Sequence, residues 1–137
     1  MAEPGHLTLT VVTPERSVVE RVACDSVSLP GELGELGILP GHTPLVALLG
    51  VGRVSFTDGG KKTSVAVRGG FVEVAGDAVR VLADLAAEKD AIDASEARQA
   101  RGDGEAHRLT VVGQEQLDVV NADVAFAEAK LAVAQGG

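Results

Sequence analysis

Hydrophobic and polar residues alternate along the first part of the chain. From residue 6 to residue 85, apolar side chains recur at every second position, as in Leu7, Leu9 and Val11, which is the period of a strand with one buried face. Turn-forming residues, rich in Gly, Asp and Pro, separate the runs. Many short strands bounded by turns indicate a β-sandwich or barrel, which we expect to end near Leu85. The predicted strands lie at about 7–12, 17–22, 24–29, 44–49, 53–57, 62–68, 71–74 and 78–83.

The pattern changes after Ala86, where Ala, Glu, Asp, Gln and Arg predominate. The tetrad Asp93-Ala94-Ser95-Glu96 predicts a helix start, because an Asp there accepts hydrogen bonds from free backbone amides and a Glu three residues on completes a capping box. We expect this helix to run to about Arg101. Since each Gly in a helix interior costs about 1 kcal/mol against Ala, Gly102 and Gly104 predict a break and a first helix of low local stability.

A second helix is predicted from residue 114 to residue 135. Its apolar side chains recur at steps of three and four and form one stripe, beside which small residues permit a close neighbour. Two helices joined by a short polar link pair antiparallel, and this hairpin must dock on the sandwich or on another chain. The predicted fold is thus a mainly β plus α protein, with a β-sandwich at residues 1–86 and a two-helix hairpin at residues 88–137. The stripe consists of Leu117, Val120, Val124, Ala127, Leu131 and Ala134, and the small residues are Ala125, Ala129 and Ala132.

Residues 30–52 hold six of the seventeen glycines and three of the five prolines. Gly gives access to backbone angles that other residues avoid, whereas Pro fixes φ and removes a hydrogen-bond donor. This stretch therefore predicts a rigid, sharply turned surface loop around which the rest of the chain is organised. Its apolar residues, Leu33, Leu36, Ile38 and Leu39, are expected to be pinned beneath the loop.

Composition narrows the classes of partner. The formal net charge of −8 and the sequence pI of about 4.8 argue against nucleic acid, whose phosphate backbone requires clustered Lys and Arg. With three Phe and no Trp or Tyr, the chain also lacks the stacking surface that single-stranded nucleic acid needs. The core must therefore be built from Val, Leu, Ile and Ala.

Cys24 is the single cysteine. An internal disulfide is therefore excluded, which suits a reducing compartment, and the strand pattern around Cys24 predicts a small buried thiol rather than a nucleophile. The N-terminal residues lack the basic and apolar regions of a signal peptide. No run approaches the about 18 apolar residues of a membrane span, so contact with a membrane is expected through a protein partner.

The chain contains His, Ser and Gly residues that could serve in metal, catalytic or nucleotide-binding motifs, but their spacing does not match those motifs. The three histidines, His6, His42 and His107, lack the spacing of a zinc site, so no metal is expected. No Ser lies in a GxSxG nucleophile elbow. The glycines follow neither the spacing of a phosphate loop nor that of a dinucleotide fingerprint, and no helix follows them.

Three arginines lie on the predicted helical part. They would hold an anion if they gathered on one side of the hairpin, whereas a solvated helix face is the interpretation that the sequence favours. The three are Arg98, Arg101 and Arg108.

The glycine-rich stretch also carries a resemblance to a known family. Residues 34–45, GELGILPGHTPL, resemble the signature loop of the F-type ATP synthase epsilon subunits, whose usual form is roughly GE(L/F)GI(L/Y)PGHxPL. His6-Leu7, residues 68–74 (RGGFVEV) and residues 79–84 (VRVLAD) are similar to this family as well. The resemblance covers most of residues 5–86 and, more loosely, the helical part from Ile92 onward.

The resemblance implies a flattened β-sandwich followed by a helical hairpin. It implies a non-catalytic rotor subunit of the central stalk, without a cofactor, that couples proton-driven rotation to ATP synthesis and inhibits ATP hydrolysis through its hairpin. The implied partners are the gamma subunit, the loops of the c-ring and, through the hairpin, the alpha/beta catalytic head. The implied location is the cytoplasmic face of a bacterial plasma membrane or, alternatively, the stromal face of a thylakoid membrane. The residues implied to contact gamma and the c-ring are Glu35, Gly37, Ile38, Pro40, Gly41 and His42.

Some members of the family bind ATP through a motif like (I/L)DxxRA. Ile92, Asp93 and Ala97 fit this motif, but Glu96 stands at the Arg position and places a like charge beside a phosphate. Arg98 or Arg101 would have to take its place. An ATP-sensing module within the same complex is therefore the alternative function. A free β-sandwich that binds a sugar or peptide is a third, and it would need an exposed aromatic or polar groove.

Overall fold

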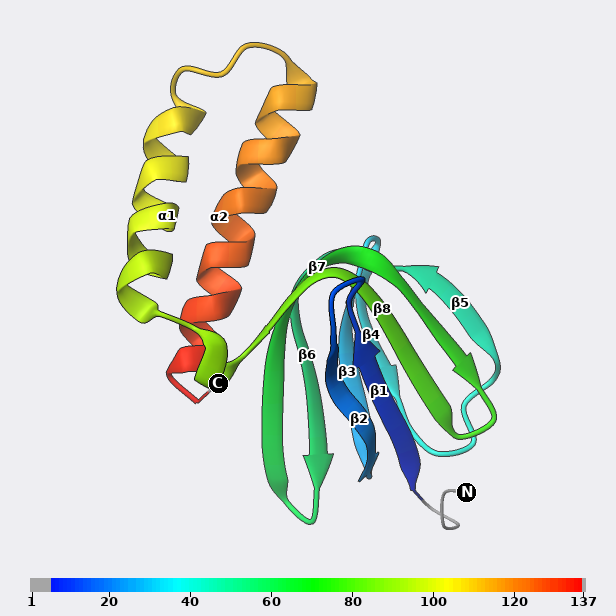
Figure 1. Cartoon of the computed structure of the whole chain (residues 1–137). Coiled ribbons are helices and arrows are strands. Elements are labelled where there is room, and N and C mark those ends of the chain that lie inside the picture. Colours follow the sequence, from blue (N-terminus) through cyan, green and yellow to red (C-terminus); the bar gives the residue numbers. More distant parts are fainter. Residues whose placement is uncertain (1–5, 137) are drawn as a thin grey trace.

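The structure is a computed structural model that describes residues 6–136, so the expectations for residues 1–5 lie outside the described part. The described chain forms a β-sandwich with two antiparallel helices at one end (Figure 1). The predicted fold class, a sandwich followed by a helical hairpin, is confirmed. The elements are β1 (Leu7–Val12), β2 (Ser17–Cys24), β3 (Ser26–Gly31), β4 (Gly34–Ile38), β5 (Leu45–Leu48), β6 (Val51–Asp58), β7 (Lys61–Ala75), β8 (Ala78–Glu88), the short 3-10 helix η1 (Lys89–Ala91), α1 (Ala94–Arg108) and α2 (Gln114–Ala134).

The strands belong to one continuous sheet with the order β2-β1-β8-β7-β6-β3-β4, and β5 pairs with β7. Paired strands are antiparallel except β1 and β8, which run parallel. β7 is long enough to take part in both layers of the sandwich. Its first half pairs with β6 and its second half with β5, and β8 pairs with parts of both halves. The sheet thus folds over on itself and encloses one core.

The prediction of separate strands at 62–68 and 71–74 is wrong, because β7 passes through Gly69-Gly70 without a break. The two glycines have φ values of 69° and 111°, which L side chains rarely adopt. A Cβ on Gly70 would also lie 1.9 Å from the backbone oxygen of Leu82 on β8. The pair therefore bends the strand between the layers rather than ending it.

Two other strands differ from expectation. β4 forms inside the stretch that the glycines mark as a loop, because its backbone pairs with β3 from Gly34 to Ile38. β8 continues past Leu85 to Glu88, since its last residues still pair with the first half of β7.

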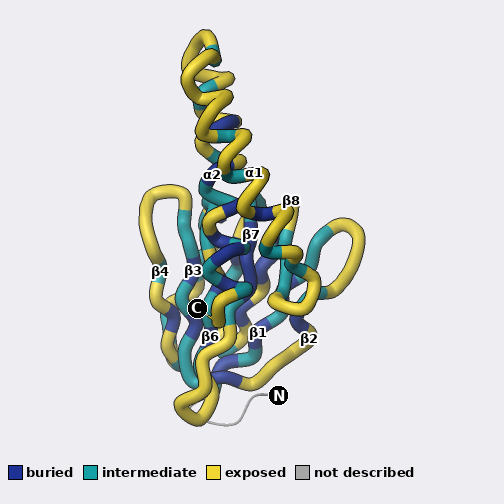
Figure 2. Tube along the Cα trace, turned by 90° about the vertical axis from the view of Figure 1, so that its left-hand side faces the viewer, coloured by how far each residue is buried: buried dark blue, intermediate teal, exposed yellow. Residues whose placement is uncertain are grey.

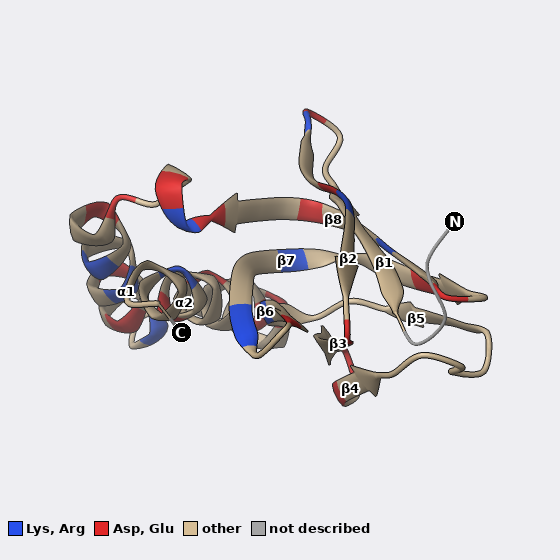
Figure 3. Ribbon diagram, turned by 90° about the horizontal axis from the view of Figure 1, so that it is seen from below, with Lys and Arg blue, Asp and Glu red and all other residues tan. Residues whose placement is uncertain are grey.

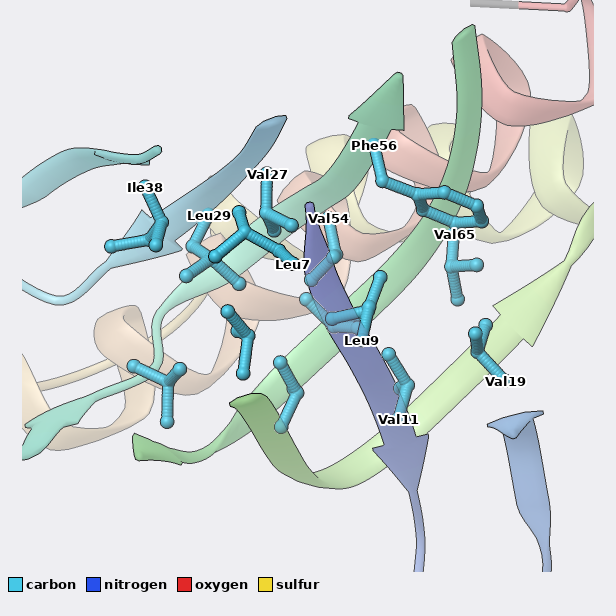
Figure 4. Packing of buried hydrophobic residues seen from close by; sticks show 14 of the residues in the cluster. Leu7, Leu9, Val11, Val19, Val27, Leu29, Ile38, Val54, Phe56 and Val65 are labelled. Carbon is cyan, nitrogen blue, oxygen red and sulfur yellow. The ribbon is translucent and has the colours of Figure 1, made fainter. Parts of the chain in front are cut away.

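The core between the layers is mainly aliphatic, as the composition predicts, and Phe56 of β6 adds an aromatic side chain to it (Figure 4). In β1, Leu7, Leu9 and Val11 are fully buried, whereas the residues between them are partly exposed. Cys24 is buried, as predicted. Burial, followed by the carboxylates of Asp58 and Asp25, raises the pKa of its thiol to about 11. The thiol therefore stays protonated and unreactive near neutral pH.

α1 begins as the sequence predicts. Asp93 precedes the helix, and its side chain accepts a hydrogen bond of 3.1 Å from the backbone N–H of Glu96. This contact satisfies one of the amides that the first turn leaves without a partner.

The predicted end of this helix near Arg101 is wrong, since α1 continues through both glycines to Arg108. Gly104 has a packing reason, because a Cβ there would lie 2.7 Å from Cγ2 of Val124 on α2. The missing side chain lets the two helices approach closely. This contact with α2 offsets the low helix propensity of glycine.

We predict that α1 exchanges its amide hydrogens faster than the sheet does. Ala97 is its single buried residue, and segments with few buried contacts open at low free energy. Hydrogen exchange followed by mass spectrometry over residues 94–108 checks this, with β7 as the internal reference. Protection of α1 equal to that of β7 would contradict the prediction.

α2 confirms the predicted second helix. Val120, Val124, Ala127 and Leu131 of the predicted stripe are buried. Figure 2 shows that the outer part of the hairpin is largely exposed, whereas burial increases toward the sandwich. Val124 of the stripe packs against Gly104 of α1, whereas Ala129 and Val133 of α2 contact the sheet.

The hairpin docks on the sandwich of its own chain through a small apolar contact. Ala129 and Val133 of α2 pack on Ala66 of β7, with Ile92 and Phe126 at the edge. An ion pair of 2.6 Å between Arg68 of β7 and Asp123 of α2 lies beside this contact.

A second ion pair lies where the chain leaves the sandwich. Arg16, in the turn between β1 and β2, donates hydrogen bonds of 2.8 and 2.5 Å to the two carboxylate oxygens of Glu88 at the end of β8. The hydrogen bond from Arg16 lowers the pKa of Glu88 from its ordinary value of 4.5. The pair therefore fixes the end of β8 next to the hairpin.

We expect Glu88→Gln to reduce the sensitivity of the fold to acid. A carboxyl group whose pKa is lower in the folded chain stabilises the fold above its unfolded pKa, and this stabilisation is lost as the pH falls through the folded pKa. Melting temperatures measured from about pH 6 down to about pH 3 should therefore drop more for the unchanged chain than for Glu88→Gln. The change is small, because both side chains are partly exposed. Glu105→Gln on the exposed side of α1 is the control, and a Glu88→Gln curve parallel to that of the unchanged chain would contradict the expectation.

Candidate functional site

The glycine-rich stretch, for which the sequence predicts partner contacts, lies along one edge of the sheet. β3 and β4 pair antiparallel through a two-residue turn at Glu32-Leu33, and β4 is the last strand of the sheet order. Glu35 and Gly37 are exposed, and Ser28 of β3 donates a hydrogen bond to the Glu35 carboxylate. This edge therefore presents backbone and carboxylate groups to the surroundings.

A tight turn follows β4. The N–H of His42 donates to the carbonyl of Leu39 at 3.1 Å, and Gly41 between them has a φ of 81°. Pro40 at the second position and a positive φ at the third define a type II β-turn, which requires Gly or Asn at that third position. The sequence Leu-Pro-Gly-His is thus the chemical basis of a preset turn.

The turn is fastened to the rest of the sandwich. The N–H of Gly41 donates to Oδ1 of Asp77 at 3.0 Å, and Asp77 lies in the turn between β7 and β8. The backbone oxygen of Asp77 in turn accepts from Thr8 of β1 at 2.8 Å. His42 contacts the carbonyl of Thr43 through Nδ1 at 2.6 Å. Hydrogen bonds therefore hold the turn in place. It lies at the end of the sandwich away from the helices (Figure 1).

The apolar residues of this stretch divide into two groups. Ile38 is buried and Leu36 packs against the core, as expected of residues beneath a loop. The expectation is wrong for Leu33 and Leu39, which are 102% and 62% exposed. Both lie in the turns at the two ends of β4, beyond the reach of the core, and they leave apolar surface beside Glu35.

The structure brings most of the predicted contact residues to one edge. Glu35, Gly37 and Gly41 are exposed, and Pro40 and His42 are partly exposed. Ile38 instead points into the core at 1% exposure, so its contribution is to anchor the segment.

The predicted nucleotide residues are more dispersed. Asp93 is engaged as the cap of α1, Ala97 is buried and Ile92 packs on the apolar contact beneath α2. Arg98 is exposed and Arg101 is partly exposed, and neither lines the cleft of about 330 Å³ between the hairpin and β7. That cleft is lined instead by residues such as Arg68, His107, Asp123 and Lys130.

Charges of both signs are interspersed along the hairpin (Figure 3). Arg98 and Arg108 are exposed, in keeping with the solvated helix face that the sequence favours.

Another group of polar side chains lies at the start of β1. His6 Nε2 is 3.3 Å from Oδ1 of Asp25, and these two residues and Asp58 offer ligand atoms within 4.8 Å of one another. Asp25 already accepts the backbone N–H of Gly59 at 3.0 Å, so this contact holds the turn between β6 and β7. The residues meet only through strand pairing, which sequence spacing does not reveal.

The fold, a β-sandwich with a helical hairpin, is similar to that of chains in two mitochondrial ATP synthases. A chain of the mitochondrial ATP synthase of Euglena gracilis, in an assembly of OSCP, F1 and c-ring, superposes with a TM-score of 0.78 at 22% identity, covering 96% of this chain and 82% of that one. A chain from the central stalk and c-ring of the Tetrahymena thermophila mitochondrial enzyme gives a TM-score of 0.61 at 10% identity, with coverages of 98% and 96%. These two likenesses concern the fold.

Sequence comparison identifies the family. Residues 6–89 match the family described as ATP synthase, Delta/Epsilon chain, beta-sandwich domain. The ATP synthase epsilon chain of Solibacter usitatus is 42% identical over 132 residues, covering 96% of this chain and 97% of that one. The epsilon chain of Desulforamulus reducens is 46% identical over 121 residues, with coverages of 88% and 89%. The chain therefore belongs to the epsilon chain family of F-type ATP synthases. Within residues 6–136, none of the helices combines the length and apolar content needed to cross a membrane.

Proposed function

We propose that this chain is a non-catalytic rotor subunit in the central stalk of a proton-translocating F-type ATP synthase. It couples rotation of the c-ring to ATP synthesis in the catalytic head. The observation that carries the proposal is the preset turn Leu39–His42, because a stiff protrusion transmits torque without yielding. The sandwich binds the gamma subunit and the c-ring, and the chain lies at the cytoplasmic membrane surface as a peripheral part of the complex.

The contact surface follows from the exposed residues of the edge. Glu35 supplies a carboxylate, and Leu39 beside the turn supplies apolar area, so a partner surface with a basic group next to apolar side chains fits this edge. Gly41 and His42 place backbone groups at the tip. Because Asp77 fixes the tip, little conformational entropy is lost when a partner binds.

The hairpin formed by α1 and α2 is proposed to slow ATP hydrolysis by contact with the catalytic head. Its apolar contact with the sandwich is small, and Ala66, Ala129 and Val133 are its buried members. Such an interface separates at modest free-energy cost, which leaves the hairpin able to reach another surface.

Add-back of the chain to an enzyme head stripped of it tests the proposal through ATP hydrolysis. The full-length chain and a chain ending at Lys89, which keeps β8 and the Arg16–Glu88 pair, are added in turn. We expect both to bind and only the full-length chain to slow hydrolysis. Binding without slowing by either would remove the inhibitory role and leave the coupling role. Failure of both to bind would overturn the proposal.

A further inference from the structure

We propose that the outer face of β1, β2 and β8 carries a binding site for an oxyanion of the phosphate type. An open cleft of about 690 Å³ lies on this face. Thr8 and Thr10 of β1, Arg21 of β2 and Arg80 of β8 line it, and Asp77 lies among the remaining lining residues. The cleft is distinct from the contact turn Leu39–His42, although Asp77, which fixes that turn, also lines the cleft.

The pairing of the strands places the key side chains in one row. Thr10 pairs with Arg80 in the parallel ladder between β1 and β8. On the other side of β1, Leu9 faces Val22 and Val11 faces Val19, so two residues of β2, Glu20 and Arg21, share the position opposite Thr10. The row therefore runs from Arg21 through Thr10 to Arg80.

Alternation along the strands turns this row outward. Leu9 and Val11 of β1 and Val79 and Val81 of β8 are fully buried, and successive side chains of a strand point to opposite faces. Thr10 and Arg80 must therefore point away from the core.

Arg21 has an unusual backbone conformation. Its φ of 45° is the single positive value at a non-glycine residue within residues 6–136, and it lies in the bulge opposite Thr10. Bulges redirect side chains, and left-handed backbone at a residue with a Cβ is strained and concentrates at functional sites. The strain thus falls on the residue that completes the row.

The two guanidinium groups are available to a ligand. Among the described residues no carboxylate lies within 4.0 Å of Arg21, and Glu73 lies 3.9 Å from Arg80, at the limit of an ion pair. Asp77 brings a negative charge to the cleft, but its Oδ1 accepts the N–H of Gly41. Two guanidinium groups and two hydroxyl groups on a fixed sheet match the oxygens of a phosphate group, which Arg binds through paired hydrogen bonds.

Titration of the ¹⁵N-labelled full-length chain with inorganic phosphate at constant ionic strength tests the site. We expect saturable shifts of the Thr8 and Thr10 amide signals and of the Arg21 and Arg80 side-chain signals. Arg80→Gln and Arg21→Asn should each weaken binding about tenfold, the effect expected when a charge-assisted hydrogen bond is lost. Asn at position 21 tolerates a positive φ and therefore preserves the bulge.

Lys61→Gln is the matched control, because it removes one positive charge from the start of β7, outside the cleft. It should leave phosphate binding unchanged. Shifts that do not saturate, or equal weakening by Lys61→Gln and Arg80→Gln, would overturn the site in favour of general charge attraction.

Vesicle sedimentation distinguishes the source of the phosphate group. Binding to phosphatidylglycerol vesicles but not to phosphatidylcholine vesicles, lost in Arg80→Gln, assigns a lipid head group as the ligand. Saturable phosphate binding without vesicle binding assigns free phosphate or a small phosphate ester. Absence of both kinds of binding would overturn the proposal.

Discussion

Replacement of Gly70 by Ala should destabilise the sandwich by more than about 3 kcal/mol. The added Cβ would lie 1.9 Å from the backbone oxygen of Leu82 and 3.0 Å from Cα of Ala83. Both are backbone atoms of the paired strand, so neither moves without opening the ladder between β7 and β8. The φ of 111° adds strain of its own. Urea unfolding of the full chain measures the loss.

Gly76→Ala is the matched control for this prediction. Gly76 also has a positive φ, of 59°, but a Cβ there meets nothing within 4 Å. It should therefore cost about 1–2 kcal/mol, the ordinary price of a left-handed residue with a Cβ. Equal destabilisation by Gly70→Ala and Gly76→Ala would contradict the prediction, because it would show that the close approach of β8 to Gly70 adds no cost.

Gly41→Val should weaken binding of the chain to the membrane-embedded complex about tenfold or more, because a type II turn needs a positive φ at this position and a β-branched residue resists it. The sandwich itself should remain folded, since a Cβ at Gly41 meets nothing within 4 Å. Binding to membrane vesicles that carry the complex but lack this chain measures the effect. Circular dichroism of the variant confirms that the fold is retained.

Gly59→Val supplies a closely matched control. Gly59 also has a positive φ, of 58°, and an added Cβ there would meet nothing within 4 Å. Its N–H donates a hydrogen bond of 3.0 Å to the side chain of Asp25. It lies in the turn between β6 and β7, outside the proposed contact edge. Loss of binding in Gly59→Val as large as in Gly41→Val would show that glycine turns in general, and not the Leu39–His42 turn, govern binding.

The sequence predicts those parts of the fold that depend on local pattern. Period-two alternation locates β1, and Asp93 marks the start of α1 correctly. The sequence predicts the ends of strands and helices least well where a glycine allows close packing. Gly69-Gly70 and Gly104 read as breaks in the sequence, yet each lies inside a continuous element because a neighbouring strand or helix occupies the space of the missing side chain.

In the candidate sites, too, the sequence predicts local features but not contacts between distant residues. The Leu-Pro-Gly-His turn is readable from the sequence, because turn chemistry is local. Its link to Asp77 is not, since the two residues are brought together by the fold. The row of Arg21, Thr10 and Arg80 depends on a bulge and on two strand registers, so a single sequence gives no signal for it beyond the outward position of each residue.

Direct observation of rotation tests whether this chain turns together with the gamma subunit. In Lys61→Cys the new thiol is exposed, whereas Cys24 is buried with a pKa of about 11, so a thiol-reactive tether reacts with this chain at position 61 before assembly and later attaches a bead there. The catalytic head, assembled with this chain, is fixed to a surface and supplied with ATP. The bead should turn continuously, in the same direction and at the same rate as a bead on the gamma subunit. A bead that stays still on this chain while the gamma bead turns would contradict this prediction.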